Sequence, residues 1–193
     1  MRTKRTIIVI ISAVMACLCV SPGYSGTILK QGDAFPAITL PGPADQRHQA
    51  YLGLTDSGMF RVSDIKAEVL IIEIFSMYCP HCQREAKNVN KLFETIETDE
   101  RARGKVKLIG IGVGNEAFEV EFFRNKYQVP FPLFEDEDLR IHEQVGSVGT
   151  PFFFCVRIGD GGYNRIFYTQ IGGFDTADQF LNKILKLSGL AIH

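Results

Sequence analysis

The sequence predicts an α/β fold in which helices cover both faces of a mixed central sheet, giving three layers. Two observations support this prediction. Over residues 70–145, β-branched apolar runs alternate with segments whose apolar residues recur at helical spacing, which is typical of βαβ units. After residue 151, two further strand-like runs flank a glycine-rich turn and precede a last helix, which predicts an antiparallel addition to the sheet.

The N-terminal part of the chain is predicted to add a hairpin to this sheet. Residues 35–40 predict a first short strand, and the proline- and glycine-rich residues 41–45 predict a loop. The turn-forming residues 55–58 lie between two short apolar runs, at residues 51–54 and 59–62. We therefore expect these two runs to pair as an antiparallel hairpin, an N-terminal extension of the fold.

The central elements are predicted to alternate between strand and helix. Residues 70–75 form a β-branched run typical of a buried strand. After Cys82, one helix face is marked by Ala86, Val89, Leu92, Phe93 and Ile96, and this helix should end before residue 103. A second buried strand follows over residues 105–113. A βαβ insert comes next, with a helix, a short strand and a short helix over residues 117–127, 131–134 and 139–145.

The C-terminal part is predicted to be a hairpin followed by a helix. Residues 151–158 and 164–171 predict its two strands, joined by a glycine-rich turn over residues 159–162. Thr176 and Gln179 have the spacing of a capping box, which marks the start of a helix. The apolar face of that helix is formed by Phe180, Leu181, Ile184, Leu185 and Leu187.

Residues 1–25 have the pattern of a secretory signal peptide. Basic residues at the start precede an apolar run over residues 7–20, which is shorter than the roughly 18 to 20 residues that a membrane-spanning helix needs. Small residues follow, so we expect cleavage near Ser25 and a single domain over residues 26–193. The alternatives are a lipoprotein signal, with lipidation at Cys17, and an uncleaved membrane anchor.

Charge and cysteine content narrow the possible functions. The formal net charge of −1 and the lack of a clustered basic stretch argue against nucleic acid as a partner. Of the five cysteines, Cys17 and Cys19 lie in the predicted signal peptide, so the mature chain would keep Cys79, Cys82 and Cys155. Because this number is odd, a simple framework of structural disulfides is not expected in an oxidising compartment.

Cys79 and Cys82 belong to a Cys-Pro-His-Cys motif at a predicted strand-to-helix junction. This position places Cys79 at a helix N-terminus, where unpaired backbone N–H groups and the helix dipole favour the thiolate. A free cysteine is mostly protonated at neutral pH, so a lowered pKa would make it reactive. Paired cysteines can also bind zinc, but zinc needs about four ligands and the sequence offers no second cysteine pair or nearby histidine pair. The motif therefore predicts a redox centre without a metal.

Several separated motifs resemble the thioredoxin superfamily. Residues 32–40 resemble the opening of redoxin domains of the TlpA/ResA type, and residues 62–65 resemble the segment before their active-site strand. Residues 129–136 match an insert that these domains carry. Residues 149–151 match the loop that holds a cis-proline opposite the two cysteines in this superfamily. The resemblance covers nearly all of the mature chain and implies a thioredoxin fold.

The active-site string itself, residues 73–82, is more similar to DsbA. However, only about 70 residues separate Cys82 from Pro151, which is too few for the large helical insertion of DsbA. The resemblance therefore implies a TlpA-like scaffold that carries DsbA-like active-site residues.

The resemblance implies a role for each polar residue of the motif. Cys79 would be the nucleophile that forms mixed disulfides, and Cys82 would resolve them. His81 could stabilise the Cys79 thiolate through a hydrogen bond or a positive charge, or it could be an exposed residue without an energetic role. Glu73 matches the buried acid beneath the resolving cysteine and could take the proton from Cys82, unless it is only a charge at a strand edge.

Further residues are expected around the two cysteines. Pro151 would keep its preceding peptide bond cis, leaving the Thr150 backbone open to pair with a substrate strand, whereas the alternative is a trans proline in a plain turn. Pro80 is expected to contact the substrate together with Thr150. Glu85 lies where TlpA/ResA-type proteins often have a glutamate, but it could equally be a solvated helix residue. Cys155 lies in an apolar strand and is expected to be a small buried residue rather than a third redox thiol.

These features predict an exported thiol-disulfide oxidoreductase that acts on cysteine-containing proteins and needs no cofactor. The scaffold implies a reductase of the cytochrome c maturation type with a membrane redox partner, whereas the Pro-His dipeptide implies a disulfide-forming oxidase like DsbA. A copper chaperone that uses both thiolates as ligands is an alternative from another class, although such chaperones usually have a longer cysteine spacing. A peroxiredoxin is less favoured, because Ser76 fits its motif but the upstream proline is missing.

Overall fold

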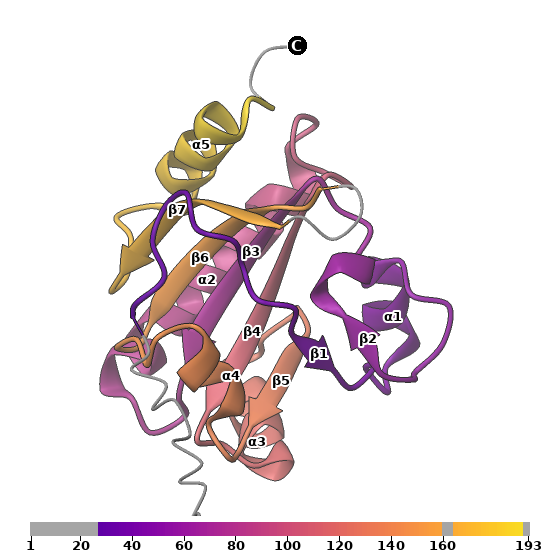
Figure 1. Ribbon diagram of the computed structural model, residues 1–193, viewed down its shortest axis with the longest axis vertical. Coiled ribbons are helices and arrows are strands. Elements are labelled where there is room, and N and C mark those ends of the chain that lie inside the picture. The colour runs from indigo at the N-terminus through magenta and orange to yellow at the C-terminus, as the bar shows by residue number, and fades with distance from the viewer. Residues whose placement is uncertain (1–26, 160–163, 191–193) are drawn as a thin grey trace, which may run out of the picture.

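The protein is built around a mixed five-stranded sheet. The computed structural model describes residues 27–159 and 164–190. The strands of the sheet are β3 (Val69–Phe75), β4 (Val106–Val113), β5 (Leu133–Asp136), β6 (Phe152–Arg157) and β7 (Arg165–Ile171). Their order is β5-β4-β3-β6-β7, with β3, β4 and β5 parallel to one another (Figure 1). β6 runs antiparallel to β3, and β7 runs antiparallel to β6, which confirms the predicted mixed sheet.

Helices cover both faces of this sheet, as predicted. They are α2 (Pro80–Thr98), α3 (Ala117–Tyr127), α4 (Arg140–Gln144) and α5 (Ala177–Ser188). Apolar residues of α2, α3 and α5 form one core with one face of the sheet. The N-terminal segment and α4 form a second core with the other face. Figure 1 shows these layers, with α2 behind the sheet and α4 in front of it.

The central strand β3 supplies side chains to both cores. Val69, Ile71 and Phe75 belong to the core under α2, whereas the alternate residues, such as Leu70 and Ile72, belong to the other core. This alternation is the period of two expected of a strand, and all seven residues of β3 are buried. Glu73 occupies the same alternating row as Ile71 and Phe75. A carboxyl group is therefore placed on the buried face that α2 covers.

The predicted N-terminal hairpin is wrong in its first strand. Residues 51–52 instead end helix α1 (Gln46–Leu52), whose N-cap Asp45 accepts a hydrogen bond of 2.8 Å from the Arg47 N–H. Gly53 ends this helix in the left-handed conformation at φ 72°, which glycine adopts without strain. Two sequence signals mark this helix, the aspartate at its N-cap and the glycine at its C-terminal end. The helix buries Leu52 completely. Asp45 and Gly53 therefore indicated a helix, but the prediction followed the two short apolar runs instead.

An antiparallel pair does exist in this region, but with a different partner. The strand β2 (Phe60–Arg61) pairs with β1 (Thr39–Leu40) rather than with residues 51–54. β1 is also shorter than the predicted residues 35–40. An isolated bridge joins Ala34 to Arg165 of β7, so the chain before β1 lies against the main sheet.

The other predicted elements are confirmed with shifts of about two residues or less, and α2 ends at Thr98, before residue 103 as predicted. At the last helix, Thr176 accepts a hydrogen bond of 3.3 Å from the Gln179 N–H, which is one half of the predicted capping box. The predicted signal peptide, including Cys17, and most of the predicted turn at 159–162 lie outside the described residues. Within the described residues, no helix is long and apolar enough to cross a membrane.

Candidate active site

The Cys-Pro-His-Cys motif lies where the central strand β3 gives way to α2. A short turn after Phe75 leads to Cys79, which has extended backbone angles and is the N-cap of α2. Pro80 takes the first helical position, where its missing N–H costs nothing because the first turn of a helix has no acceptor for it. The expected strand-to-helix junction is therefore present, and it places the Cys79 sulfur at the helix N-terminus.

The Cys79 thiol is half-buried and has hydrogen-bond partners on two elements. Its sulfur accepts from the Cys82 N–H at 3.4 Å, and its S–H donates to the Thr150 carbonyl at 3.3 Å. Partial burial works against ionisation, but hydrogen bonds from the Thr150 side chain, from Cys82 and from the His81 backbone N–H hold the pKa of Cys79 below its usual value. The site thus favours a thiolate on the cysteine that solvent can reach.

Cys82 is the opposite kind of thiol. Its side chain is fully buried in the core under α2, one helical turn after Cys79. Burial raises the pKa of Cys82, and the nearby Glu73 and Cys79 raise it further because a second negative charge would be repelled. Both cysteines are free thiols. The pair therefore combines an accessible, ionisable thiol with a buried one that needs a base.

Glu73 lies on β3, on the same buried face, and is only 3% exposed. Burial raises its pKa to about 8, with smaller contributions from the charges of Glu85 and Cys79. Its influence on the pKa of Cys82 shows that the carboxyl group and the buried thiol are electrostatic neighbours. A carboxyl group with a pKa near neutrality can hold or release a proton at physiological pH.

The loop before β6 faces the two cysteines. The peptide bond between Thr150 and Pro151 is cis, as predicted, and the Thr150 carbonyl is the group that accepts from Cys79. His142 of α4 contributes a contact that the sequence did not indicate, because its Nε2 lies 2.7 Å from the Val148 carbonyl. The loop that carries Thr150 is therefore fastened to the short helix of the βαβ insert.

His81 and Pro80 are exposed on the first turn of α2. The His81 ring is directed along the helix, with its Nδ1 2.8 Å from an Arg84 guanidinium nitrogen. Because arginine can only donate, Nδ1 is the acceptor in this contact. The group of His81 that lowers the pKa of Cys79 is its backbone N–H.

Glu85 is half-buried and links α2 to the loop between β7 and α5. Its carboxylate accepts from the Phe174 N–H at 3.2 Å and from the Asn88 side chain at 2.8 Å. Asn88 also donates to the Phe174 carbonyl at 2.7 Å. A Cβ atom on Gly173 would collide with this carboxylate, so a larger residue there would displace the Glu85 side chain. Glu85 is therefore a structural clamp as well as a charge that raises the pKa of Glu73.

A polar network around the turn before Cys79 was not found from the sequence. The buried Asn115, just after β4, accepts from the Met77 N–H at 2.8 Å and donates to the Glu119 carboxylate at 3.4 Å. The Tyr78 hydroxyl also donates to that carboxylate. The available signal was a lone asparagine at the end of an apolar strand, which indicates a polar contact without naming its partner.

We expect Asn115→Ala to destabilise the protein by about 1 to 3 kcal/mol, because the Met77 N–H loses its acceptor in a partly buried turn. Urea denaturation measures this change. Asn125→Ala is the matched control, since the exposed Asn125 side chain only donates to Glu121 on the helix surface, and its effect should stay within about 0.5 kcal/mol. Equal stabilities of the two variants would contradict the assigned role of Asn115.

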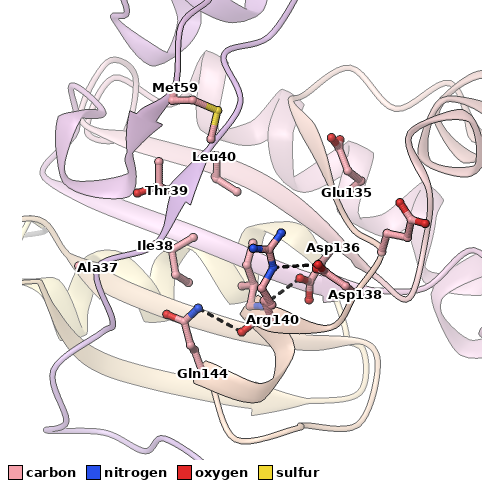
Figure 2. A pocket seen from close by; sticks show the side chains of 12 residues that line it. Ala37, Ile38, Thr39, Leu40, Met59, Glu135, Asp136, Asp138, Arg140 and Gln144 are labelled. Atoms are coloured by element: carbon pink, nitrogen blue, oxygen red, sulfur yellow. Dashed lines mark hydrogen bonds and ion pairs between the residues drawn. The ribbon is translucent and has the colours of Figure 1, made fainter.

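Two further features lie apart from these groups. Cys155 is fully buried on β6, where burial raises its pKa, in agreement with its expected role as a small core residue. A cavity of about 520 Å³ lies between β1 and the segment from β5 to α4, and Figure 2 shows Met59, Leu40 and the ion pair of Arg140 with Asp138 around it. None of the motif residues lines this cavity. Among the described residues, no group of three or more His, Cys, Asp or Glu side chains could hold a metal ion.

Comparison with known proteins shows the family and the fold. The AhpC/TSA family model matches residues 31–167. No curated protein sequence matches the chain. Among solved structures, the thioredoxin domain of a thiol-disulfide oxidoreductase from Bacteroides vulgatus is 14% identical, with a TM-score of 0.60 over 81% of this chain and 99% of that one.

Two further structures are similar over most of their length. A secreted disulfide oxidoreductase of Mycobacterium tuberculosis is 16% identical, with a TM-score of 0.54 over 78% of this chain and 96% of that one. The peroxidoxin BcpB of the same organism is 16% identical, with a TM-score of 0.58 over 86% of this chain and 99% of that one. These likenesses show that the chain has the thioredoxin fold.

Proposed function

The chain belongs to the AhpC/TSA family, and we propose that this thiol-disulfide oxidoreductase reduces disulfides of protein substrates outside the cytoplasm through Cys79 and Cys82. The observation that carries the proposal is the pairing of unlike thiols. An accessible thiol with a lowered pKa is three residues from a buried thiol with a raised pKa, and a buried carboxyl group lies beside the second.

The first step is an attack by the Cys79 thiolate on a substrate disulfide. A bond forms between the Cys79 sulfur and one substrate sulfur, and the other substrate sulfur leaves as a thiolate that takes a proton. The Thr150 backbone beside Cys79 supports a substrate strand in this position, and exposed Pro80 lies next to it. This assignment makes Thr150, Pro151 and Pro80 the substrate-facing groups.

The second step resolves the mixed disulfide. Cys82 gives its proton to the ionised fraction of Glu73, and the resulting thiolate attacks the Cys79 sulfur. The second substrate sulfur leaves, and a disulfide between Cys79 and Cys82 remains. Two electrons have passed from the pair to the substrate, so a thiol donor must reduce the enzyme again. We assign this task to a membrane redox partner, as in cytochrome c maturation.

We infer the direction of electron flow from the environment of Cys79. A strong oxidant needs a highly stabilised thiolate at Cys79. Each unit by which the pKa of this cysteine falls makes the reduction potential of the pair less negative by about 30 mV, and the pair a stronger oxidant. The His81 ring is hydrogen-bonded to Arg84, and His81 lowers the pKa of Cys79 through its backbone N–H, which supports the weaker stabilisation that suits a reductase. A disulfide-forming oxidase like DsbA is the alternative in which His81 turns its charge toward Cys79.

Turnover assays separate these functions. We expect the protein, supplied with dithiothreitol, to accelerate insulin reduction, and its oxidised form to oxidise reduced ribonuclease slowly. Fast ribonuclease oxidation with slow insulin reduction would instead indicate the oxidase. Rapid consumption of hydrogen peroxide would indicate a peroxidase, a function that is supported by Ser76 and by the likeness to BcpB. Stoichiometric Cu(I) binding without any turnover would indicate the copper chaperone.

We propose that the protein is exported, because residues 1–25 have the pattern of a signal peptide. Cleavage of this peptide would leave a mature chain that begins near residue 26. The similarity to the secreted disulfide oxidoreductase of M. tuberculosis supports this location. N-terminal sequencing of the protein after expression with its leader would show residue 26 or a close neighbour first. A chain lipidated at Cys17, or one that keeps its leader in the membrane, would contradict this cleavage.

A further inference from the structure

The loop that carries Thr150 is fastened at one end by the His142 side chain. His142 is half-buried on α4, and its Nε2 lies 2.7 Å from the carbonyl oxygen of Val148. Because a carbonyl oxygen only accepts, Nε2 carries a proton and donates it. Val148 is only 3% exposed, so its carbonyl needs a donor within the protein. The imidazole therefore makes a hydrogen bond that an apolar side chain at this position could not make.

His142 is itself held by the end of β5. The carboxylate of Asp136, the last residue of β5, accepts from the Ile141 N–H at 2.9 Å and from the His142 N–H at 2.8 Å. The His142 carbonyl in turn accepts from the Ser147 N–H at 2.8 Å. Ser147 has a left-handed backbone at φ 51°, which a residue other than glycine adopts at a cost, so the loop depends on its contacts to keep this shape. The sheet therefore sets the position of the loop through α4.

Thr150 lies between two fastened points and contacts Cys79. Val148 is two residues earlier, and on the other side the Pro151 carbonyl accepts from the Gly172 N–H at 2.8 Å. Partial burial works against the ionisation of Cys79, and the hydrogen bond from the Thr150 side chain is the largest of the contacts that lower its pKa. The Thr150 carbonyl also accepts from the Cys79 S–H, but S–H is a weak donor. The hydroxyl of Thr150 therefore has the larger effect on ionisation.

We propose that His142 is a positioning residue, which holds Thr150 against Cys79 and thereby keeps this cysteine in its reactive form. The inference rests on the proposed function, because the reactive form is what attacks a substrate disulfide. Without the imidazole, the Val148 carbonyl loses its donor, and Gly149, which has no side chain to pack, lets Thr150 move away. The thiolate then loses a hydrogen bond, and less of Cys79 is ionised at a given pH.

The pH dependence of Cys79 alkylation by iodoacetamide tests this role, because only the thiolate reacts. The reduced protein is alkylated over a range of pH, and modification of Cys79 is followed by mass spectrometry. The main variant is His142→Leu, and His142→Phe, which also lacks a donor, replaces it if the first does not fold. In His142→Gln, the side-chain amide can donate to the Val148 carbonyl in place of the imidazole.

The matched control is His48→Leu. His48 likewise contacts a backbone carbonyl, with its Nε2 3.3 Å from that of Pro130. Pro130 precedes β5 and Cys79 follows β3, and both strands are parallel to β4, so the two residues lie at opposite ends of the sheet. His48→Leu therefore removes a contact of the same kind without altering the loop before β6.

The alkylation profile of His142→Leu should move to higher pH. At about one pH unit below the midpoint of the unaltered protein, its alkylation rate should fall about threefold, the effect of one lost hydrogen bond. His142→Gln and His48→Leu should stay within about 1.5-fold of the unaltered rate. In a Thr150→Val background, which lacks the hydroxyl, His142→Leu should cause no further loss, because both changes remove the same contact.

The proposal is overturned if His142→Leu keeps the profile of the unaltered protein, if His48→Leu shifts it as far, if His142→Gln does not restore it, or if the losses in Thr150→Val and His142→Leu add. Failure of the proposed function has a different signature. In that case the unaltered protein reduces neither insulin nor oxidised glutathione, while the alkylation profiles still decide the role of His142.

Discussion

Replacing Cys79 with serine should abolish disulfide exchange, to less than about one-thousandth of the original rate, because only the thiolate at this position can attack a substrate disulfide. Cys79 is the one described cysteine that is not fully buried and whose pKa is lowered. A serine hydroxyl is not ionised at neutral pH and forms no stable bond to sulfur. Insulin reduction with dithiothreitol as the donor measures the loss.

Two matched variants make this result specific. Cys82→Ser should stop after the first step and accumulate a mixed disulfide between Cys79 and the substrate, which mass spectrometry detects. Cys155→Ala should keep the original rate, since Cys155 is buried on β6 away from the pair. Exchange that survives in Cys79→Ser, or a mixed disulfide formed through Cys82, would contradict the assigned order of the two thiols.

Replacing Glu73 with glutamine should change how stability depends on pH. The pKa of Glu73 is about 8 in the folded protein against 4.5 for an ordinary glutamate, so the unfolded chain releases this proton at lower pH than the folded protein does. Stability is therefore lost as pH rises from about 4.5 to about 8 and is unaffected below that window. Glu73→Gln has no such proton, so its stability relative to the unaltered protein should rise by about 3 kcal/mol between pH 4 and pH 7.

Urea denaturation of the reduced proteins at several pH values measures this difference. Using the change between two pH values removes any constant effect of the glutamine amide. Glu100→Gln, at an exposed glutamate, is the control, and its difference from the unaltered protein should vary by less than about 0.5 kcal/mol. A difference for Glu73→Gln that does not vary with pH would show that the pKa of Glu73 is the same in the folded protein as in the unfolded chain.

The same substitution has a consequence for the reaction. If Glu73 takes the proton of Cys82, Glu73→Gln should slow the resolution of the mixed disulfide while leaving its formation by Cys79 unchanged. Single-turnover measurements with a disulfide peptide separate the two steps.

The fold could be predicted largely because its elements carry local signals. The row of β-branched residues in β3 and the helical spacing of Ala86, Val89 and Leu92 in α2 each specify one element with one buried face. The failure at residues 51–54 has a local reason as well. Helix α1 depends on a cap at Asp45 and a left-handed Gly53, which outweigh the weak strand signal of a four-residue run.

The candidate site could be predicted from the sequence only where its residues lie in short sequence motifs. Cys79, Cys82 and the cis peptide bond before Pro151 are read from short motifs. Contacts across the fold are different, because nothing near Asn115 in sequence points to Met77, and nothing near His142 points to the loop before Thr150. The His81 ring likewise turns to Arg84, one turn along α2, which depends on side-chain packing rather than on the motif.

The reduction potential of the Cys79/Cys82 pair tests the central claim most directly. The protein is equilibrated in glutathione and dithiothreitol buffers, free thiols are trapped, and the fraction of each cysteine that is oxidised is measured by mass spectrometry. We predict a reversible two-electron transition confined to Cys79 and Cys82, with a potential near or below about −270 mV. A value near about −120 mV would contradict the reductase, and the absence of any reversible disulfide between these two cysteines would contradict thiol-disulfide exchange as the function of the site.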